Sequence, residues 1–257
     1  MYRITRIKCN FIYPIVVLVN DTITSVSQMD CQPRGGRGNR NEESRDVRLS
    51  KSLSYALRHG ASKMGLQMNS DGFVFVEELL AHKQFHSFSL EDVERVVATN
   101  DKQRFKLCHH PEDGHLHIRA NQGHSVQVTD LELRAVALDD PDYPREAVHG
   151  SYMKHWPSIR SQGISRMNRT RIHLAPGLPG DGRVISGMRQ SCDLAVYIDV
   201  AKAISDGIQF FWSENGVLLT PGDAAGMLPP CYFSRAQRLK PSRESHSQPA
   251  HQVLLNS

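Results

Sequence analysis

The stretch Leu49-Ser-Lys-Ser-Leu-Ser-Tyr-Ala-Leu-Arg-His-Gly60 decides how the first half of this 257-residue chain is organised. Its apolar residues recur at helical spacing and predict one buried helix face: Leu49, Leu53, Ala56 and Leu57. The helix is expected to begin at an N-cap on Asp46 and to end at Gly60. Arg58 and His59 then occupy its last turn, where the helix dipole favours a positive charge.

Two shorter helices and a hairpin are expected next. A helix is predicted from Phe75 to His82, and the S-x-x-D pattern of Ser89 and Asp92 opens another. Alternating apolar residues over 105–108 and 116–119 predict two strands joined by a Pro-Glu-Asp-Gly turn. Three helices followed by a hairpin is the layout of a winged-helix domain. Such domains bind nucleic acid in many proteins and other proteins elsewhere, so both remain open.

The second half is predicted to be a mixed α+β, mostly antiparallel domain. A Pro-Asp-Tyr-Pro-Arg-Glu linker at 141–146 separates it from the first half. Short apolar runs between Gly- and Pro-rich loops predict strands at 147–149, 172–175, 194–199, 209–212 and 217–220.

Composition excludes wholesale disorder and a membrane-spanning helix. Hydrophobic residues make up 39% of the chain, and no apolar run approaches the roughly 20 residues that a span needs. The two ends carry more than the whole net charge of +4, since residues 48–233 sum to −1, so the net charge is no argument for nucleic-acid binding. Five scattered cysteines favour a reducing compartment, cytoplasm or nucleus.

The two ends are expected to lie outside the folded part. Residues 1–45 are predicted to be a disordered or isoform-specific leader, because 32–46 is rich in glycine and arginine and almost free of apolar residues. Residues 234–257, rich in serine, proline and histidine, are predicted to be a loose tail.

Arginines beside polar loops are the candidates for chemistry. Arg104 follows Asn-Asp-Lys-Gln, Arg119 leads into a polar loop at 120–125, and Arg169 and Arg171 precede Ile-His-Leu. The planar fork of donors on arginine suits phosphate oxygens, although a surface arginine is more often in an ordinary ion pair. Only convergence in space would make them a phosphate site. There is no Walker A motif, and no cysteine–histidine pair has metal-ligand spacing.

Eight blocks of the sequence resemble the RNA 2′-phosphotransferase family. In chain order they are 49–59, 70–73, 100–105, 121–125, 148–150, 172–177, 185–189 and 215–217. The resemblance covers about residues 46–233. It implies a winged-helix RNA-binding lobe at 46–140, followed by an NAD-binding lobe of the ADP-ribosyltransferase type at 146–233.

The resemblance also implies a reaction. A member of this family removes the 2′-phosphate that tRNA ligation leaves at a splice junction. The phosphate displaces nicotinamide from NAD, and the ribose O2″ then attacks the phosphorus, releasing ADP-ribose 1″,2″-cyclic phosphate. NAD is a co-substrate and no metal is implied. The protein is expected to act as a monomer without a membrane.

Candidate site residues carry over from the family blocks. The catalytic set is Arg58, His59, Arg104 and Arg169. Arg166 and Arg171 compete for the fourth place, which Arg169 fits best by its spacing from His173. The NAD-binding set is His149, Gly150, Ser151, His173, Leu174, Ala175, Ile185, Ser186, Gly187 and Arg189. The RNA-binding set is Lys51, Arg119, Asn121, Gln122, His124 and Ser125.

Two other functions stay open. One is an ADP-ribosyltransferase that modifies nucleic-acid phosphates or protein, and the other is a non-catalytic winged-helix RNA-binding protein. The intact Arg58-His59 and Arg104 blocks favour the complete reaction, and the intact His149-Gly150 and 185–189 blocks argue against the non-catalytic protein. Many ADP-ribosyltransferases keep a glutamate near the position of Val217. A phosphate monoester, with a second pKa of about 6, is already an anion and needs no such base.

Overall fold

The structure is a computed structural model that describes residues 37–144, 146–181, 184–239 and 252–253. From Arg40 onward these residues belong to one compact unit of mixed helix and sheet content, which confirms the α+β class. Residues 1–36 of the expected leader, and 240–251 and 254–257 of the expected tail, lie outside the described residues. No helix in the described part is long and apolar enough to cross a membrane.

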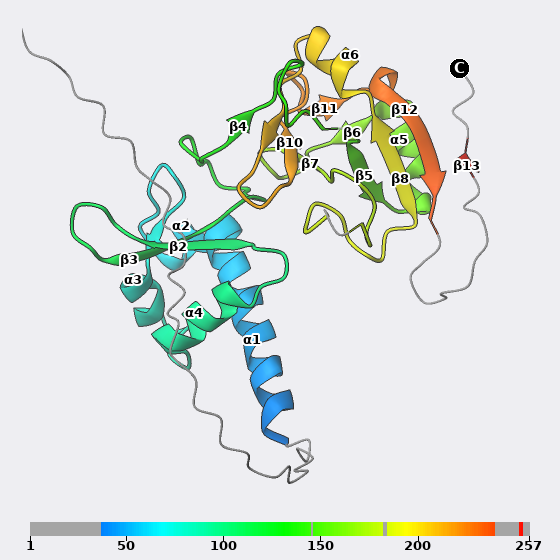
Figure 1. Cartoon of the computed structure of the whole chain (residues 1–257). Coiled ribbons are helices and arrows are strands. Elements are labelled where there is room, and N and C mark those ends of the chain that lie inside the picture. Colours follow the sequence, from blue (N-terminus) through cyan, green and yellow to red (C-terminus); the bar gives the residue numbers. More distant parts are fainter. Residues whose placement is uncertain (1–36, 145, 182–183, 240–251, 254–257) are drawn as a thin grey trace, which may run out of the picture. The chain divides into compact units, whose positions relative to one another are not determined.

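The first half combines helices with a small antiparallel sheet (Figure 1). Its helical elements are α1 (Arg37–Tyr55), the π-helical turn η1 (Ala56–Gly60), α2 (Ala61–Met64), α3 (Val76–Ala81) and α4 (Leu90–Ala98). The sheet has the order β1-β3-β2, with β1 at Val74–Phe75, β2 at Phe105–His109 and β3 at Leu116–Ala120. The predicted second and third helices and the hairpin are confirmed, and Ser89 forms a capping box with Asp92.

Helix α1 begins earlier than the sequence predicted. It starts at Arg37, so Asp46 is an interior residue and the expectation of a disordered segment is wrong for 37–45. The charged side chains of this segment find partners on α4. Arg45 lies 2.6 Å from Asp92, and Asp46 lies 2.8 Å from Arg95. The polar first part of α1, ahead of its apolar face at Leu49 and Leu53, is thus tied to a second helix by ion pairs.

The prediction that Gly60 ends the first helix is wrong. The chain widens into the π-turn η1 and continues through α2. The end comes at Gly65, whose φ of 72° is left-handed and whose N–H donates to the Ser62 carbonyl at 3.2 Å. This is the usual way in which glycine stops a helix. π-turns insert an extra residue into a helix and occur often at functional sites.

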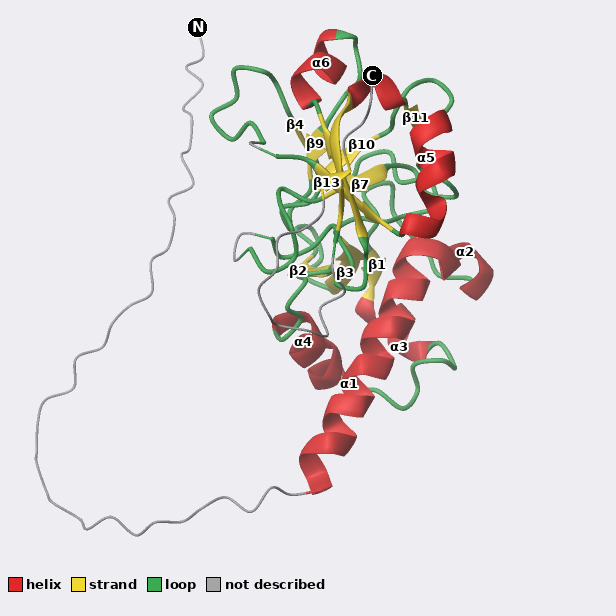
Figure 2. Cartoon of the chain, turned by 90° about the vertical axis from the view of Figure 1, so that its right-hand side faces the viewer, coloured by secondary structure: helices red, strands yellow, loops and turns green. Residues whose placement is uncertain are grey.

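The second half contains two four-stranded antiparallel sheets and a short two-stranded one (Figure 2). One sheet has the order β4-β9-β10-β7, formed by Arg134–Ala135, Phe211–Trp212, Leu218–Thr220 and Ile172–Leu174. The other has the order β13-β12-β8-β5, formed by Gln252–Val253, Phe233–Arg238, Leu194–Ile198 and Val148–Ser151. The pair β11-β6 joins Met227–Leu228 to Ile164–Ser165. The helical elements are η2 (Met153–His155), α5 (Trp156–Gln162), α6 (Val200–Ser205) and η3 (Pro230–Tyr232).

The first residues of the predicted tail belong to the folded part of the protein. Strand β12 pairs with β8 from Phe233 to Arg238, so the expectation of a loose tail is wrong for 234–238. The reason is burial on one side: Phe233 and Ala236 enter the core, while Ser234 and Arg235 are exposed. Residues 252–253 then pair with β12 as β13.

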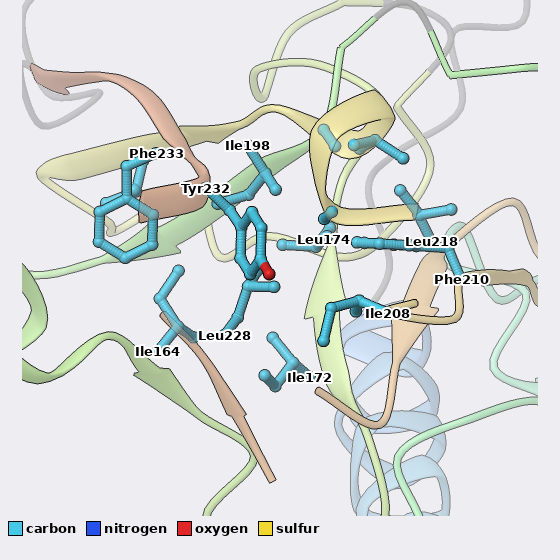
Figure 3. Packing of buried hydrophobic residues seen from close by; sticks show 14 of the residues in the cluster. Ile164, Ile172, Leu174, Ile198, Ile208, Phe210, Leu218, Leu228, Tyr232 and Phe233 are labelled. Atoms are coloured by element: carbon cyan, nitrogen blue, oxygen red, sulfur yellow. The ribbon is translucent and has the colours of Figure 1, made fainter. Parts of the chain in front are cut away.

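Each half has its own apolar core. Figure 3 shows the second-half core, where Ile164, Ile172, Leu174 and Tyr232 converge from different strands and from η3. The first-half core joins the apolar face of α1 to α3, α4 and the sheet. Polar contacts connect the halves: the Thr170 N–H donates to the His124 carbonyl at 3.0 Å.

We expect Asp92 to contribute strongly to the stability of the first half. It is nearly buried, caps α4 and pairs with both Arg45 and Arg95, which hold its pKa well below the usual range. Asp92→Asn should lower the free energy of unfolding by about 2–3 kcal/mol in a urea titration. Glu94→Gln, on an exposed position of the same helix, should change it by less than about 0.5 kcal/mol. Equal effects of the two variants would contradict this role.

Candidate active site

A cavity of about 750 Å³ lies where the two halves meet, and its lining is strongly cationic. On the first-half side, the cavity is bordered by residues of η1 and of the turn that precedes β2. On the second-half side, it is bordered by loops around β7 and by residues 186–189. Its basic side chains are Arg58, Lys63, Lys102, Arg104, Arg166, Arg169, Arg171 and Arg189. No aspartate or glutamate of the described chain lines it. Such a surface favours a ligand with several negative charges.

Arg58 is fixed through its backbone and has free donors on its side chain. The wide π-turn leaves the Arg58 carbonyl available, and the Ser125 N–H donates to it at 2.9 Å. The guanidinium Nε and Nη2 atoms are buried and have no hydrogen-bond partner in the described part of the protein. Burial, followed by the charges of Arg104 and Arg169, lowers the Arg58 pKa to about 10. Arg58 therefore stays charged at neutral pH and can bind an anion.

His59 lies beside Arg58 and is neutral at pH 7. Burial, together with the charges of Arg58 and Arg169, lowers its pKa below the ordinary value of 6.5. Its Nδ1 atom shares a 2.8 Å hydrogen bond with the Ser125 hydroxyl. Because that bond orients the ring, His59 can hold or give a proton at its other nitrogen.

Arg104 follows a strained turn that two asparagine side chains hold. Gln103 has a φ of 43°, which non-glycine residues rarely adopt. Asn121 Nδ2 donates to the Gln103 carbonyl at 2.8 Å, and Asn215 Nδ2 donates to the Lys102 carbonyl at 2.9 Å. Asn215 comes from the second half and is buried, so the position of Arg104 depends on both halves.

Arg169 is the arginine of its loop that interacts with the other site residues. Its Nη1 atom lies 3.3 Å from His173 Nδ1, and its charge lowers the pKa of Arg58. Arg166 instead donates to the Arg169 carbonyl at 2.8 Å. Arg171 lies over the Phe211 ring at 5.6 Å. The geometry therefore favours Arg169 over its two neighbours as a partner of Arg58 and Arg104.

Small residues shape the second-half wall of the cavity. A Cβ atom on Gly150 would collide with Met188 Cγ, so the Met188 side chain packs directly over this glycine. Gly187 has a φ of 100°, and a Cβ there would lie 3.0 Å from the Leu174 carbonyl oxygen. His149 Nδ1 lies 3.1 Å from the His173 carbonyl, while His173 Nε2 is buried without a partner among the described residues. Burial lowers the pKa of His149 and that of His173, the latter to about 3.

Comparison with known proteins agrees with this site. Residues 44–222 match the model of a family described as RNA 2'-phosphotransferase, Tpt1 / KptA family. The chain belongs to this family. The match includes every arginine and histidine that lines the cavity, so the cationic cavity is a feature of an RNA 2'-phosphotransferase family member.

Three relatives show how far the similarity extends. The tRNA 2'-phosphotransferase 1 of Danio rerio is 87% identical over 217 residues, covering 83% of this chain and 96% of that one. The protein of the same name from Homo sapiens is 56% identical over 215 residues, covering 82% and 84%. The tRNA 2'-phosphotransferase of Saccharomyces cerevisiae is 37% identical over 186 residues, covering 70% and 80%.

The structure brings the four predicted catalytic residues together. Arg58, His59, Arg104 and Arg169 all line the cavity. Of the predicted NAD-binding set, those that line it are His149, Gly150, His173, Ser186, Gly187 and Arg189. Ser151, Leu174, Ala175 and Ile185 do not. The Ala175 N–H and carbonyl are both taken by Val148, which joins the two larger sheets at this point.

The predicted RNA-binding residues have mixed positions. Gln122 and Ser125 line the cavity, and Lys51 is exposed in a neighbouring hollow beside α4. Asn121 and His124 are buried. Arg119 is also buried, bonded to Glu132 at 2.9 Å and Glu214 at 3.2 Å. These three residues thus support the site or the contact between the two halves. Their side chains do not line the cavity.

Sequence reasoning missed several residues of the cavity. Tyr55, Lys63 and Lys102 line it, although none was assigned a role. Tyr55 and Lys63 lie close to the Arg58-His59 pair in sequence, and Lys102 precedes Arg104 by two positions. Tyr55 and Lys102 lie inside the matched blocks 49–59 and 100–105, and Lys63 lies just after the first, so position in or beside a matched block was the available signal. The described residues contain no group of three or more metal-ligating side chains arranged to hold an ion.

We expect the protein to lose stability in mild acid because of its buried histidines. Burial lowers the pKa of His124 to about 4 and that of His173 to about 3. Unfolded histidines titrate near 6.5, so the unfolded chain binds more protons below that pH, and stability falls as the pH drops toward 4. The loss should be about 2 kcal/mol per histidine at pH 5.

Urea titrations at pH 7.5 and 5.0 would measure this loss. His124→Gln should reduce the difference between the two pH values by about 2 kcal/mol. His109→Gln, which changes an exposed histidine, should leave the difference intact. If both variants behaved alike, buried neutral histidines would not be the cause.

We also expect anions to stabilise the folded protein. Pyrophosphate at about ten times its dissociation constant should raise the Tm by about 3–5 °C, because it binds the folded cavity and not the unfolded chain. Raising the salt concentration should reduce the shift. Arg104→Gln should diminish the shift, whereas Arg235→Gln, which removes an exposed ion pair with Glu146, should not. A shift that is unaffected by Arg104→Gln would place the anion elsewhere.

Proposed function

We propose that this protein removes the internal 2′-phosphate from RNA in an NAD-dependent reaction, and that its RNA is ligated tRNA carrying this phosphate at the splice junction. The observation that supports the proposal most directly is the convergence of Arg58, Arg104 and Arg169 around His59 in a cavity without carboxylates. The names of the relatives support the choice of tRNA.

The two halves fit the roles that this reaction requires. We propose that the first half is a winged-helix RNA-binding lobe, because α1, α3 and α4 precede the hairpin of β2 and β3. We propose that the second half is an ADP-ribosyltransferase-like NAD-binding lobe, built on its two four-stranded sheets. The substrates would then meet in the cavity where the halves join, each bound mainly by one lobe.

The arginines are proposed to bind the 2′-phosphate and to stabilise charge at phosphorus. Phosphoryl transfer depends mainly on positioning and on electrostatic stabilisation of the three equatorial oxygens. Three guanidinium groups, with Arg58 donors that have no other described partner, can supply both. A phosphate monoester is already charged at neutral pH. The reaction therefore needs no general base at the position of Val217, which is apolar and buried.

His59 is proposed to move a proton at the oxygen that leaves the RNA. Its lowered pKa leaves the ring neutral at pH 7, and Ser125 occupies Nδ1. The remaining nitrogen, Nε2, has no hydrogen-bond partner among the described residues. It can take a proton from an attacking hydroxyl and return it to the 2′-oxygen.

The second-half wall has the features that NAD would need. Gly150 and Gly187 lack the Cβ atom that would meet Met188 and the Leu174 carbonyl, so this wall packs closely beside the cavity, and His173 Nε2 is a buried polar atom without a described partner. Arg189 adds a positive charge for a pyrophosphate. NAD would supply the ribose carbon that accepts the phosphate. These residues fit that co-substrate, and we propose that the protein needs no metal.

The state and location of the protein are also proposals. We propose that it acts as a monomer in the cytoplasm or nucleus. Cys108, Cys192 and Cys231 are free thiols, which suits a reducing compartment.

The deciding experiment incubates an oligonucleotide carrying one internal 2′-phosphate with the protein, with and without NAD. We expect RNA with a 2′-hydroxyl and free nicotinamide to form only when NAD is present. Arg104→Gln and Arg169→Gln should each lower kcat by about 100-fold or more, because each removes a donor to a charged transition state. Arg235→Gln is the matched control outside the cavity and should stay within about twofold of the unmodified protein.

His59→Ala should affect the two steps of the reaction differently. Formation of the 2′-hydroxyl should slow by about 100-fold, while release of nicotinamide slows much less, because the phosphate needs no base to react. A parallel loss of both products would contradict the role given to His59. NAD consumption that leaves ADP-ribose on the RNA would instead favour an ADP-ribosyltransferase. RNA binding without any NAD consumption would favour a non-catalytic protein.

A further inference from the structure

Tyr55, the last residue of α1, is a large aromatic side chain left exposed at the cationic cavity. It is 45% exposed, although its neighbours Leu53, Ala56 and Leu57 are fully buried. The Tyr55 side chain lines the same cavity as Arg58 and His59. The first-half core does not include it. Packing therefore gives no reason for an aromatic residue at this position.

The Tyr55 ring is held in place by Gly60. A Cβ atom on Gly60 would lie 2.6 Å from Tyr55 Cε1 and 3.2 Å from Cζ, so part of the ring packs against this glycine. The ring centroids of Tyr55 and His59 are 6.5 Å apart, with their planes at 52°. A ring that is supported on one side and partly open to solvent is pre-organised for a flat ligand.

We infer that Tyr55 stacks on the base of the nucleotide that carries the 2′-phosphate. The inference rests on the proposed function and specifies its substrate. In a nucleotide, the base is on C1′ and the 2′-phosphate is on the adjacent C2′. If Arg58 and the other arginines bind the phosphate, the base must lie close beside them. Tyr55 is the aromatic side chain of the described cavity lining, and it lies within one helical turn of Arg58.

Stacking also suits a substrate whose base varies. An aromatic ring stacks on any base, because every base has a flat face, and it reads no hydrogen-bonding pattern. Tyr55 would thus confer a preference for nucleotides over free phosphate or phosphorylated sugars. NAD also contains two flat rings, so the experiment must distinguish its rings from the RNA base.

Equilibrium binding without NAD tests the inference, because no turnover occurs. The probe is a short RNA with 2-aminopurine on the nucleotide that carries the 2′-phosphate. We expect its fluorescence to be quenched on binding to the unmodified protein. Tyr55→Leu should abolish the quenching and raise the Kd about 5- to 100-fold. Tyr55→Phe, which keeps the ring, should stay much closer to the unmodified protein. Leu138→Ala, at an exposed position outside the cavity, is the matched control.

An abasic probe gives a second test that needs no variant. RNA lacking the base at the 2′-phosphorylated nucleotide should bind the unmodified protein about 5- to 100-fold more weakly. With Tyr55→Leu, the intact and abasic probes should bind alike. Equal binding of both probes to the unmodified protein would overturn the inference. It would also be overturned if Tyr55→Leu weakened NAD binding and left RNA binding unchanged.

Turnover of the same RNA with NAD is measured separately. If the unmodified protein binds and quenches the probe but never converts it, the proposed function is wrong and the stacking site stands. If it converts the RNA but Tyr55→Leu changes neither quenching nor Kd, the function stands and the stacking site is wrong.

Discussion

The constraint on which this site depends is the mutual repulsion of the cations that line one cavity without a carboxylate among them. The cost is visible at Arg58, where burial and two neighbouring arginines lower the pKa to about 10. Glu132 and Glu214 do not line the cavity and both pair with Lys106 and the buried Arg119, and Asp101, whose charge acts on Arg104, does not line it either. The fold thus keeps negative charge away from the place where a phosphate would supply it.

Holding such a site requires contacts from both halves of the molecule. The turn before Arg104 is strained at Gln103, and its carbonyls are bonded by Asn121 from the first half and Asn215 from the second. Because a residue in a rare backbone conformation persists only where its surroundings fix it, these two amides hold the turn that precedes Arg104. Asn100 Oδ1 then accepts from the Arg104 N–H and from its Nη1 atom, each at 3.2 Å. Strain and repulsion are therefore both balanced by contacts that are far apart in sequence.

The sequence predicted what local patterns determine. Helices α3 and α4 and the hairpin follow from periodicity and from the capping box at Ser89. The start of α1 did not follow from local patterns, because Asp92 and Arg95, the ion-pair partners of Arg45 and Asp46, lie on another helix. The catalytic set came from the family resemblance, which also selected Arg169 by its spacing from His173. The burial of Arg119 beneath Glu132 and Glu214 is a tertiary property, which no local pattern indicates.

The π-turn shows how one local irregularity can arrange several functions. An ordinary helical turn would use the Arg58 carbonyl within the helix, whereas the wider turn leaves it to the Ser125 N–H. That bond fixes the backbone between Arg58 and His59, and the Ser125 hydroxyl orients the His59 ring. The same turn contains Gly60, which supports Tyr55. Gly60 was expected to stop the helix. The helix instead continues through the wider turn, which brings Tyr55, Arg58 and His59 to one cavity within a short segment.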